Sequence, residues 1–174
     1  MTFQEDEQKL HEVSNKLDRI RGNSWKKFKG DTINRLIISL LRPYVKNYKI
    51  FGPNAFIEDC PTEFDILIVN TTAEPINEYS NCYKKEDVKL AIEVKKHGFY
   101  YKKTEAKAKM KEYFDKQNLV GVPFLYITLK ESKRLKADVE AVLGNRCFTL
   151  GLSPEPWLDG EWEKFVNTVK SKLM

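Results

Sequence analysis

Two apolar stretches of this chain contain charged residues that a protein core does not normally accept. In LAIEVKK, residues 90–96, Glu93 and Lys95 alternate with aliphatic side chains. Alternation with a period of two is typical of a β-strand and places Glu93 and Lys95 on one face, about 6.6 Å apart along the strand. Burial of a charge is costly unless the charge is paired or bound to a cation. The pattern therefore predicts a charged partner for this strand.

The second stretch, EFDILIVN at residues 63–70, places Asp65 on the same strand face as Leu67 and Val69. If the two strands are neighbours, Asp65 and Glu93 lie within a few ångströms, where desolvated carboxylates repel each other. A hard divalent cation with oxygen ligands relieves that repulsion, and Lys95 can orient a water or a phosphate. The structural alternative is a buried Glu93–Lys95 ion pair, with Asp65 bonded to the backbone.

An acid on one strand followed by acid-x-lysine on the next resembles the PD-(D/E)xK nuclease superfamily, and here these residues are Asp65 and Glu93-Val94-Lys95. The resemblance covers residues 31–129 and implies a restriction-endonuclease-like α/β fold, a central mixed β-sheet flanked by helices. It implies that Asp65 and Glu93 bind Mg²⁺, for which Mn²⁺ can substitute, with the backbone carbonyl of Val94 as a further ligand. It also implies that Lys95 positions the attacking water in metal-assisted hydrolysis of a phosphodiester bond.

The sequence departs from the superfamily pattern in two places. Pro61 does not directly precede Asp65, because the chain reads PTEFD. Many members also carry a glutamate on the first core helix, where this chain offers Asp31 and Asn34 instead. Asp31 is therefore a candidate metal ligand, and it is equally a candidate N-cap of a helix that begins there. Glu63 is a further candidate ligand, or else a surface carboxylate at the end of the strand.

Positive charge is concentrated after the acid-x-lysine strand. The formal net charge is +5, and residues 95–136 hold 12 Lys and Arg but 4 Asp and Glu. A local basic field suggests a polyanionic partner, nucleic acid first, and the resemblance favours DNA. The candidate phosphate contacts are Lys96, Lys103, Lys107 and Lys111, and the candidate stacking rings are Phe99, Tyr100 and Tyr101. The alternative is a solvated lysine face with rings that pack into the core.

Composition and length indicate a globular protein. With 174 residues, 41% hydrophobic and 32% charged, the chain is expected to form one domain, with the nuclease core at 31–129 and additions at 4–21 and 131–174. Three widely spaced cysteines make neither a zinc pattern nor a disulfide framework. Because the acidic N-terminus lacks a signal-peptide pattern and no apolar run is long enough to cross a bilayer, we expect a cytoplasmic protein.

Hydrophobic periodicity predicts an alternation of helices and strands. The expected helices cover residues 4–21, 31–46, 104–117, 131–143 and 160–173. The expected strands cover residues 47–52, 63–70, 88–96, 122–129 and 146–152, with a break at 21–30 and a polar loop at 71–87. This order favours a central mixed sheet with helices around it.

The sequence supports two functions on this one fold. The first is a metal-dependent nuclease, with a DNA endonuclease favoured by the resemblance and not by any residue. One active site cuts one strand, so cleavage of both strands would require a homodimer or another partner. The alternative is a catalytically inactive nucleic-acid-binding module. A third hypothesis is an interaction subunit whose basic helix binds an acidic protein.

Overall fold

The computed structural model describes residues 2–22, 25–97, 121–153 and 157–174, together with positions 108, 111, 112 and 115. Its helices are α1 (Phe3–Asp18), α2 (Lys26–Leu41), α4 (Lys133–Leu143) and α5 (Glu161–Leu173). Its strands are β1 (Tyr48–Phe51), β2 (Ala55–Ile57), β3 (Glu63–Phe64), β4 (Ile66–Asn70), β5 (Cys82–Tyr83), β6 (Val88–His97), β7 (Phe124–Ser132), β8 (Cys147–Thr149) and β9 (Leu152–Ser153). Within this part of the chain, no helix combines the length and apolarity that a membrane crossing requires.

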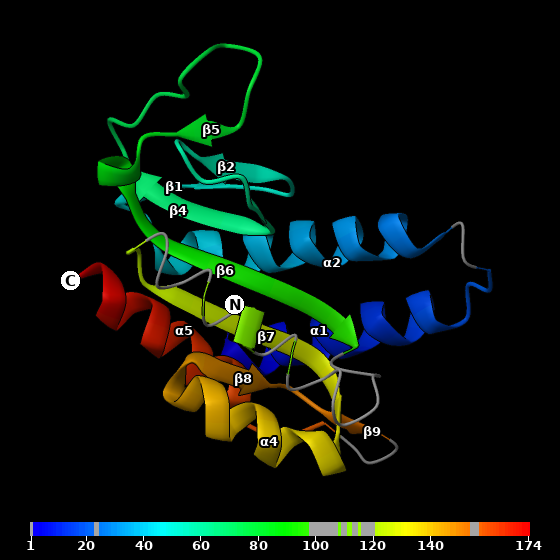
Figure 1. Ribbon diagram of the computed structural model, residues 1–174. Helices are drawn as coiled ribbons and strands as arrows, with labels where there is room; N and C mark the ends of the chain where they lie inside the picture. Colours follow the sequence, from blue (N-terminus) through cyan, green and yellow to red (C-terminus); the bar gives the residue numbers. More distant parts are fainter. Residues whose placement is uncertain are drawn as a thin grey trace.

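A mixed β-sheet forms the centre of the protein. Its strand order is β1-β4-β6-β7-β8, and β9 pairs with the end of β7. The β1–β4 and β4–β6 pairs are antiparallel, whereas β6–β7 and β7–β8 are parallel. A second, smaller sheet has the order β3-β2-β5 (Figure 1). This arrangement confirms the predicted α/β class with a central mixed sheet flanked by helices.

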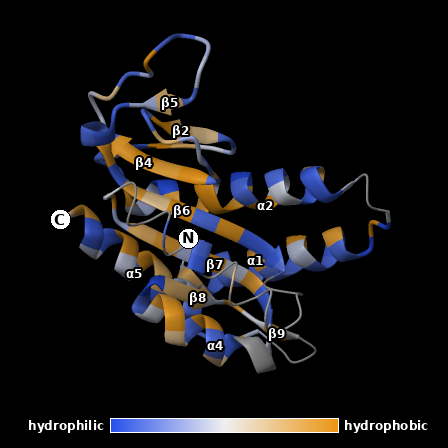
Figure 2. Cartoon of the chain, viewed as in Figure 1, coloured by the Kyte–Doolittle hydropathy of each residue, from blue (hydrophilic) through white to orange (hydrophobic). Residues whose placement is uncertain are grey.

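The two faces of the central sheet are buried against different elements. One face packs against α1, α2 and α5, through side chains such as Ile37 and Phe165. The other face packs against the small sheet and α4, through side chains such as Ile57 and Val139. Apolar residues follow the inner strands, and polar residues follow the outer faces of the helices (Figure 2). Each fully buried aliphatic side chain contributes about 1.5–3 kcal/mol, so this double burial holds the strands in register.

The first helix connects the two ends of the chain. Thr2 and Glu5 form a capping box at the start of α1, in which each side chain accepts a hydrogen bond from the other's backbone N–H. One turn on, a carboxylate oxygen of Glu7 accepts a hydrogen bond from the backbone N–H of Trp162 at 2.9 Å. Because Trp162 lies in the first turn of α5, the negative charge of Glu7 also complements the helix dipole there.

The structure differs from the predicted elements in several places. The second helix begins at Lys26 and not near Asp31, so the stretch 25–30 is helical where a break was expected. Asp31 therefore lies in the second turn of α2 and is not its N-cap. The predicted strand 63–70 is two strands, β3 and β4, separated by Asp65. The predicted loop 71–87 contains β5, a two-residue strand whose length is below what periodicity detects. The predicted helix 104–117 lies outside the described residues, apart from isolated positions.

Candidate active site

Asp65 lies where the chain passes from one sheet to the other. Phe64 pairs with Ala55 in the small sheet, and Ile66 pairs with Ile92 in the central sheet. The backbone bends between them, at Asp65. Gly52 packs against this bend: a Cβ there would lie 2.2 Å from the Asp65 carbonyl oxygen, and φ of Gly52 is +147°. Only glycine is compatible with so close an approach and that φ, so Gly52 helps to hold the bend.

The register of β4 and β6 brings the two acids to the same level. Ile66 is opposite Ile92 and Leu67 is opposite Ala91, which places Asp65 level with Glu93. Glu93 is buried, with 7% of its surface exposed, and it forms an ion pair with Lys95. The Nζ of Lys95 also lies 3.6 Å from Oδ2 of Asp65. Two carboxylates from neighbouring strands thus share one ammonium group, and the expectation that their strands are neighbours is confirmed.

Two further donors orient the Asp65 carboxylate. The side-chain amide of Asn34, on α2, donates to Oδ1 at 2.9 Å, and the backbone N–H of Val94 donates to Oδ2 at 2.8 Å. The N–H of Ala91 bonds in the opposite direction, to the carbonyl of Pro123. Backbone groups alternate in direction along a strand, so the N–H and C=O of Val94 both face the side of Asp65. The role of the Val94 carbonyl as a metal ligand stays a prediction.

The charge of Lys95 depends on the two acids. Burial opposes the charged form of this side chain, but the negative charges of Glu93 and then Asp65 outweigh burial and raise the pKa of the ammonium group. Lys95 is therefore protonated at neutral pH. The contacts of Glu93 with Lys95 and of Asp65 with the backbone are also those that the structural alternative predicts.

The chemistry of the donor set decides whether a metal fits. Within the described residues, no group of three or more His, Cys, Asp or Glu side chains is arranged to hold a metal ion. Mg²⁺ does not need three such ligands, because it is commonly bound through one or two carboxylates, with waters and substrate phosphates completing the octahedron. Asp65, Glu93 and the Val94 carbonyl are oxygen donors of that kind. The residues present therefore fit a Mg²⁺ ion that also contacts substrate.

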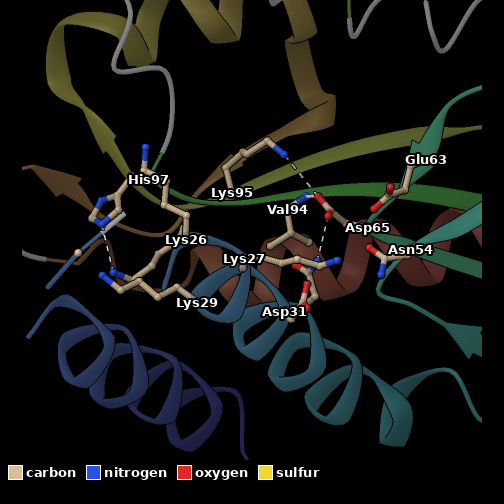
Figure 3. A pocket seen from close by; sticks show the side chains of 14 residues that line it. Lys26, Lys27, Lys29, Asp31, Asn54, Glu63, Asp65, Val94, Lys95 and His97 are labelled. Carbon is tan, nitrogen blue, oxygen red and sulfur yellow. Dashed lines mark hydrogen bonds and ion pairs between the residues drawn. The ribbon is translucent and has the colours of Figure 1, made fainter. Parts of the chain in front are cut away.

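An open cleft of about 1180 Å³ lies between the ends of these strands and α2 (Figure 3). Asp65, Val94 and Lys95 line its strand side, and Asn34 and Asp31 line its helix side. The remaining lining residues are Gly22, Lys26, Lys27, Lys29, Gly30, Asn54, Glu63, Lys96 and His97. Glu93 is not part of the lining and contacts the cleft through Lys95. Asp31 and Glu63 thus share the cleft with Asp65, Glu63 as an exposed side chain of β3.

Lys96, a predicted phosphate contact, lines the cleft and takes part in an ion network. Its side chain is 8% exposed and forms an ion pair with Asp18, at the end of α1. Lys130 lies 3.1 Å from the other oxygen of Asp18, and the His97 ring lies 3.0 Å from the first. Burial opposes the ionised form of Asp18, but Lys96 and Lys130 outweigh it and lower the pKa of the carboxyl group to about 2. The end of α1 covers this part of β6, which no local pattern in the sequence reveals.

The other predicted nucleic-acid contacts are only partly described. Lys111 is exposed, in agreement with a solvent-facing lysine. Lys103 and Lys107 lie outside the described residues, as do the predicted stacking rings at 99–101. The sequence reasoning missed Lys26, Lys27, Lys29 and Gly30 as cleft residues. The signal was present as the basic run KKFK at 26–29, but that stretch was interpreted as a break between helices.

The fold is an α/β architecture built on a mixed sheet, with the candidate site where β4 begins and β6 ends. The chain is similar in structure to NucC of P. aeruginosa ATCC27853 in its cAAA-bound form, with a TM-score of 0.67. The likeness covers 99% of this chain and 90% of NucC, at 12% sequence identity. No protein-family model and no curated protein sequence matches the chain. The likeness therefore shows a shared fold over nearly the whole of both chains.

Proposed function

We propose that this chain is a metal-dependent nuclease that hydrolyses phosphodiester bonds in nucleic acid, with DNA as the substrate and endonucleolytic cleavage as the reaction. The observation that carries the proposal is the convergence of Asp65, at the start of β4, and Glu93, on β6, on the ammonium group of Lys95 beside an open cleft. The whole-chain likeness to NucC supports the fold on which this site is built. The resemblance to the PD-(D/E)xK motif supports the proposal independently.

Asp65 and Glu93 would hold a Mg²⁺ ion, with the Val94 carbonyl and, from across the cleft, Asp31 as further oxygen donors. When bound, Mg²⁺ or Mn²⁺ lowers the pKa of a coordinated water and stabilises negative charge on a phosphate. Asn34 and the Val94 N–H hold the Asp65 carboxylate in one orientation. These donors act on the acid before any substrate arrives, so the site is preorganised.

Lys95 has two roles in this proposal. Without a competing cation it neutralises the two carboxylates and so reduces their repulsion. With a bound cation to balance the two acids, the ammonium group of Lys95 would orient a water and stabilise charge that develops on the scissile phosphate. Lys95 lies on the cleft wall between the buried Glu93 and the open space, where both roles are within its reach.

A cleavage assay tests the proposal. Wild-type protein is incubated with supercoiled plasmid, linear duplex, single-stranded DNA and RNA, with Mg²⁺, Mn²⁺ or EDTA. The variants Asp65→Asn, Glu93→Gln and Lys95→Met should each lose about a hundredfold or more of the metal-dependent rate. The exposed Glu86 provides a matched control, because Glu86→Gln removes a similar charge far from the cleft. Cleavage that survives in Asp65→Asn or in EDTA would contradict the proposal.

The inactive module is favoured by one observation: Lys95 already pairs with both acids, as in a purely structural network. That function predicts binding of nucleic acid in EDTA, equal in wild type and in Asp65→Asn, with no cleavage under either metal. The same assay, read by binding as well as by cleavage, therefore separates the two functions. Cutting of both strands of the plasmid would require two sites, and sedimentation of the active species would show whether these come from a homodimer.

A further inference from the structure

We infer that the first turns of α2 form a phosphate-binding track, defined by Lys26, Lys27 and Gly30, over which the backbone of the substrate strand reaches Asp65. The inference rests on the proposed nuclease function and adds to it the surface that holds the substrate. It differs from the sequence-based expectation, which placed the phosphate contacts after Lys95. The track borders the same cleft as Asp65 and Lys95 (Figure 3).

The residues at the start of α2 are unfavourable for a helix N-terminus. Its N-cap, Trp25, makes no side-chain cap hydrogen bond, and its first turn contains no acidic residue. The first turn instead carries Lys26 and Lys27, whose positive charges are unfavourable next to the N-terminal end of the helix dipole. By contrast, α1 has a capping box with acids in its first turn, and α5 has acids there too. Residues that oppose local stability are typical of functional positions.

Gly30 is a further residue near the start of α2 that lowers the stability of the helix. A glycine inside a helix lowers its stability relative to alanine, because glycine loses more backbone freedom on folding. No packing contact requires a glycine here: a Cβ at Gly30 would have no neighbouring atom within 4 Å among the described residues. The missing side chain instead leaves bare backbone facing the cleft. A phosphate group can approach the helix there more closely than it could approach any larger residue.

The positions of these residues connect the helix start to the candidate site. Lys26, Gly30 and Asn34 are spaced by four and form one row along α2. At the end of the row, Asn34 donates its hydrogen bond to Asp65. Lys27 lies beside the row, and all four residues line the cleft. A strand that follows the row therefore passes from two positive charges to the proposed metal ligand.

The charge of the cleft suits a polyanion. Its lining includes five lysines and three acids. Of the lysines, Lys29 donates to the carbonyl of Ile20, and Lys95 and Lys96 are paired with acids. Lys26 and Lys27 are exposed, and the structure gives neither an ion pair nor a hydrogen bond with any described residue. These two ammonium groups are thus available to neutralise phosphates, the group that recurs at every nucleotide.

The test combines binding with stability. We would measure fluorescence anisotropy of labelled single-stranded and duplex DNA in EDTA, over a range of salt, for wild type and Lys26→Glu/Lys27→Glu. The matched control is Lys170→Glu/Lys172→Glu, which makes the same change of charge in the last turn of α5, outside the cleft. The track variant should bind about tenfold or more weakly at low salt, with a smaller salt dependence, whereas the control should change by about twofold or less. The melting temperature of Lys26→Glu/Lys27→Glu should rise, because acidic residues stabilise the first turn of a helix.

Gly30→Ala gives an independent readout that does not alter charge. Alanine should raise the melting temperature and lower both DNA affinity and the cleavage rate, because its methyl group occupies the track. Ser39→Ala is the control, because Ser39 is exposed on α2 and the substitution also favours the helix. Equal loss of binding in the two double variants, or unchanged binding and cleavage in Gly30→Ala, would overturn the inference. Wild type that does not bind DNA at all would overturn it as well.

Failure of the track and failure of the nuclease proposal give different results. If wild type binds DNA through the track but cuts nothing with either metal, the track stands and the nuclease proposal fails. If wild type cuts, and Lys26→Glu/Lys27→Glu cuts and binds as well as wild type does, the nuclease proposal stands and the track is wrong.

Discussion

The side-chain amide of Asn34 donates a hydrogen bond of 2.9 Å to Oδ1 of Asp65, across the boundary between α2 and the central sheet. Asn34 is itself buried, with 4% of its surface exposed. Because this hydrogen bond fixes the direction of Oδ1, Asn34 orients the Asp65 carboxylate. A helix residue thus orients the acid at the bend between β3 and β4.

Replacement of Asn34 by leucine should reduce cleavage by about tenfold or more, because the Asp65 carboxylate loses a donor that orients it. The cleavage rate and the free energy of unfolding are measured together, with Asn167→Leu on the exposed face of α5 as the control. A loss of rate that only follows a loss of stability would assign Asn34 a structural role.

Replacement of Lys95 by methionine should abolish cleavage and at the same time strengthen Mg²⁺ binding. The ammonium group of Lys95 lies 3.6 Å from Asp65 and pairs with Glu93, so it competes with a cation for both acids. We expect the apparent Kd for Mg²⁺ to fall by about tenfold at pH 8, as judged from the rise in melting temperature with metal concentration. Lys84→Met, an exposed position, is the control. Weaker Mg²⁺ binding by Lys95→Met would show that the acids do not form the metal site.

The ion network at Asp18 should make stability depend on acid pH. Because its pKa in the folded protein is about 2, below the ordinary value of 3.8, ionised Asp18 stabilises the fold. This contribution is complete above pH 3.8 and is lost as the pH falls through about 2. Asp18→Asn should therefore lower the free energy of unfolding near neutral pH, and the difference from wild type should shrink towards pH 2. Urea titrations at several pH values measure this difference in the free energy of unfolding, with Glu86→Gln as the control. A difference that does not change with pH would contradict the prediction.

The buried Asp6 joins the two ends of the protein. Its Oδ2 accepts hydrogen bonds from the Tyr44 hydroxyl at 2.8 Å and from the Trp162 indole at 3.3 Å, and Asp6 is 1% exposed. Burial, with the hydrogen bond to Asp6, raises the pKa of Tyr44 to about 12.

Tyr44→Phe should lower the free energy of unfolding by about 1–3 kcal/mol, because it removes one of the donors that compensate a buried carboxylate. Denaturation by urea would measure this loss. In wild type the contribution should persist at pH 10 and fall as the pH rises through about 12, where Tyr44 ionises. A loss within about 0.5 kcal/mol, the range of ordinary surface substitutions, would mean that another group or a water replaces the hydroxyl.

The predictable part of the candidate site came from strand alternation. Glu93 and Lys95 share a face of β6, and Leu90, Ile92 and Val94, which alternate with them, face the core on the other side, as their period of two indicates. Because an acid among aliphatics is costly, the sequence around Asp65 is enough to single out that residue as well. The α/β class followed from the order of periodic segments.

Other features of the site depend on contacts between residues distant in the chain. Asp65 lies at a bend because β3 and β4 belong to different sheets. No local pattern within EFDILIVN indicates that the chain passes from one sheet to the other there. The Lys96 side chain is largely covered because it pairs with Asp18, at the end of α1 and 78 residues away in sequence. Asn34 acts on Asp65 only because α2 packs across the strand end.

The sequence by itself determined which residues can do chemistry: two acids and a lysine at strand spacing, within apolar segments that must become the core. It could do so because side-chain direction in a strand follows from the chain alone. Only the tertiary structure decided what surrounds them. The residues at the start of α2 are unfavourable for a helix, so the sequence predicts a break there. In the structure this stretch is helical and supplies lysines to the wall of the cleft. Packing of α2 against the sheet outweighs those weak preferences, and such long-range packing is not visible in any local stretch.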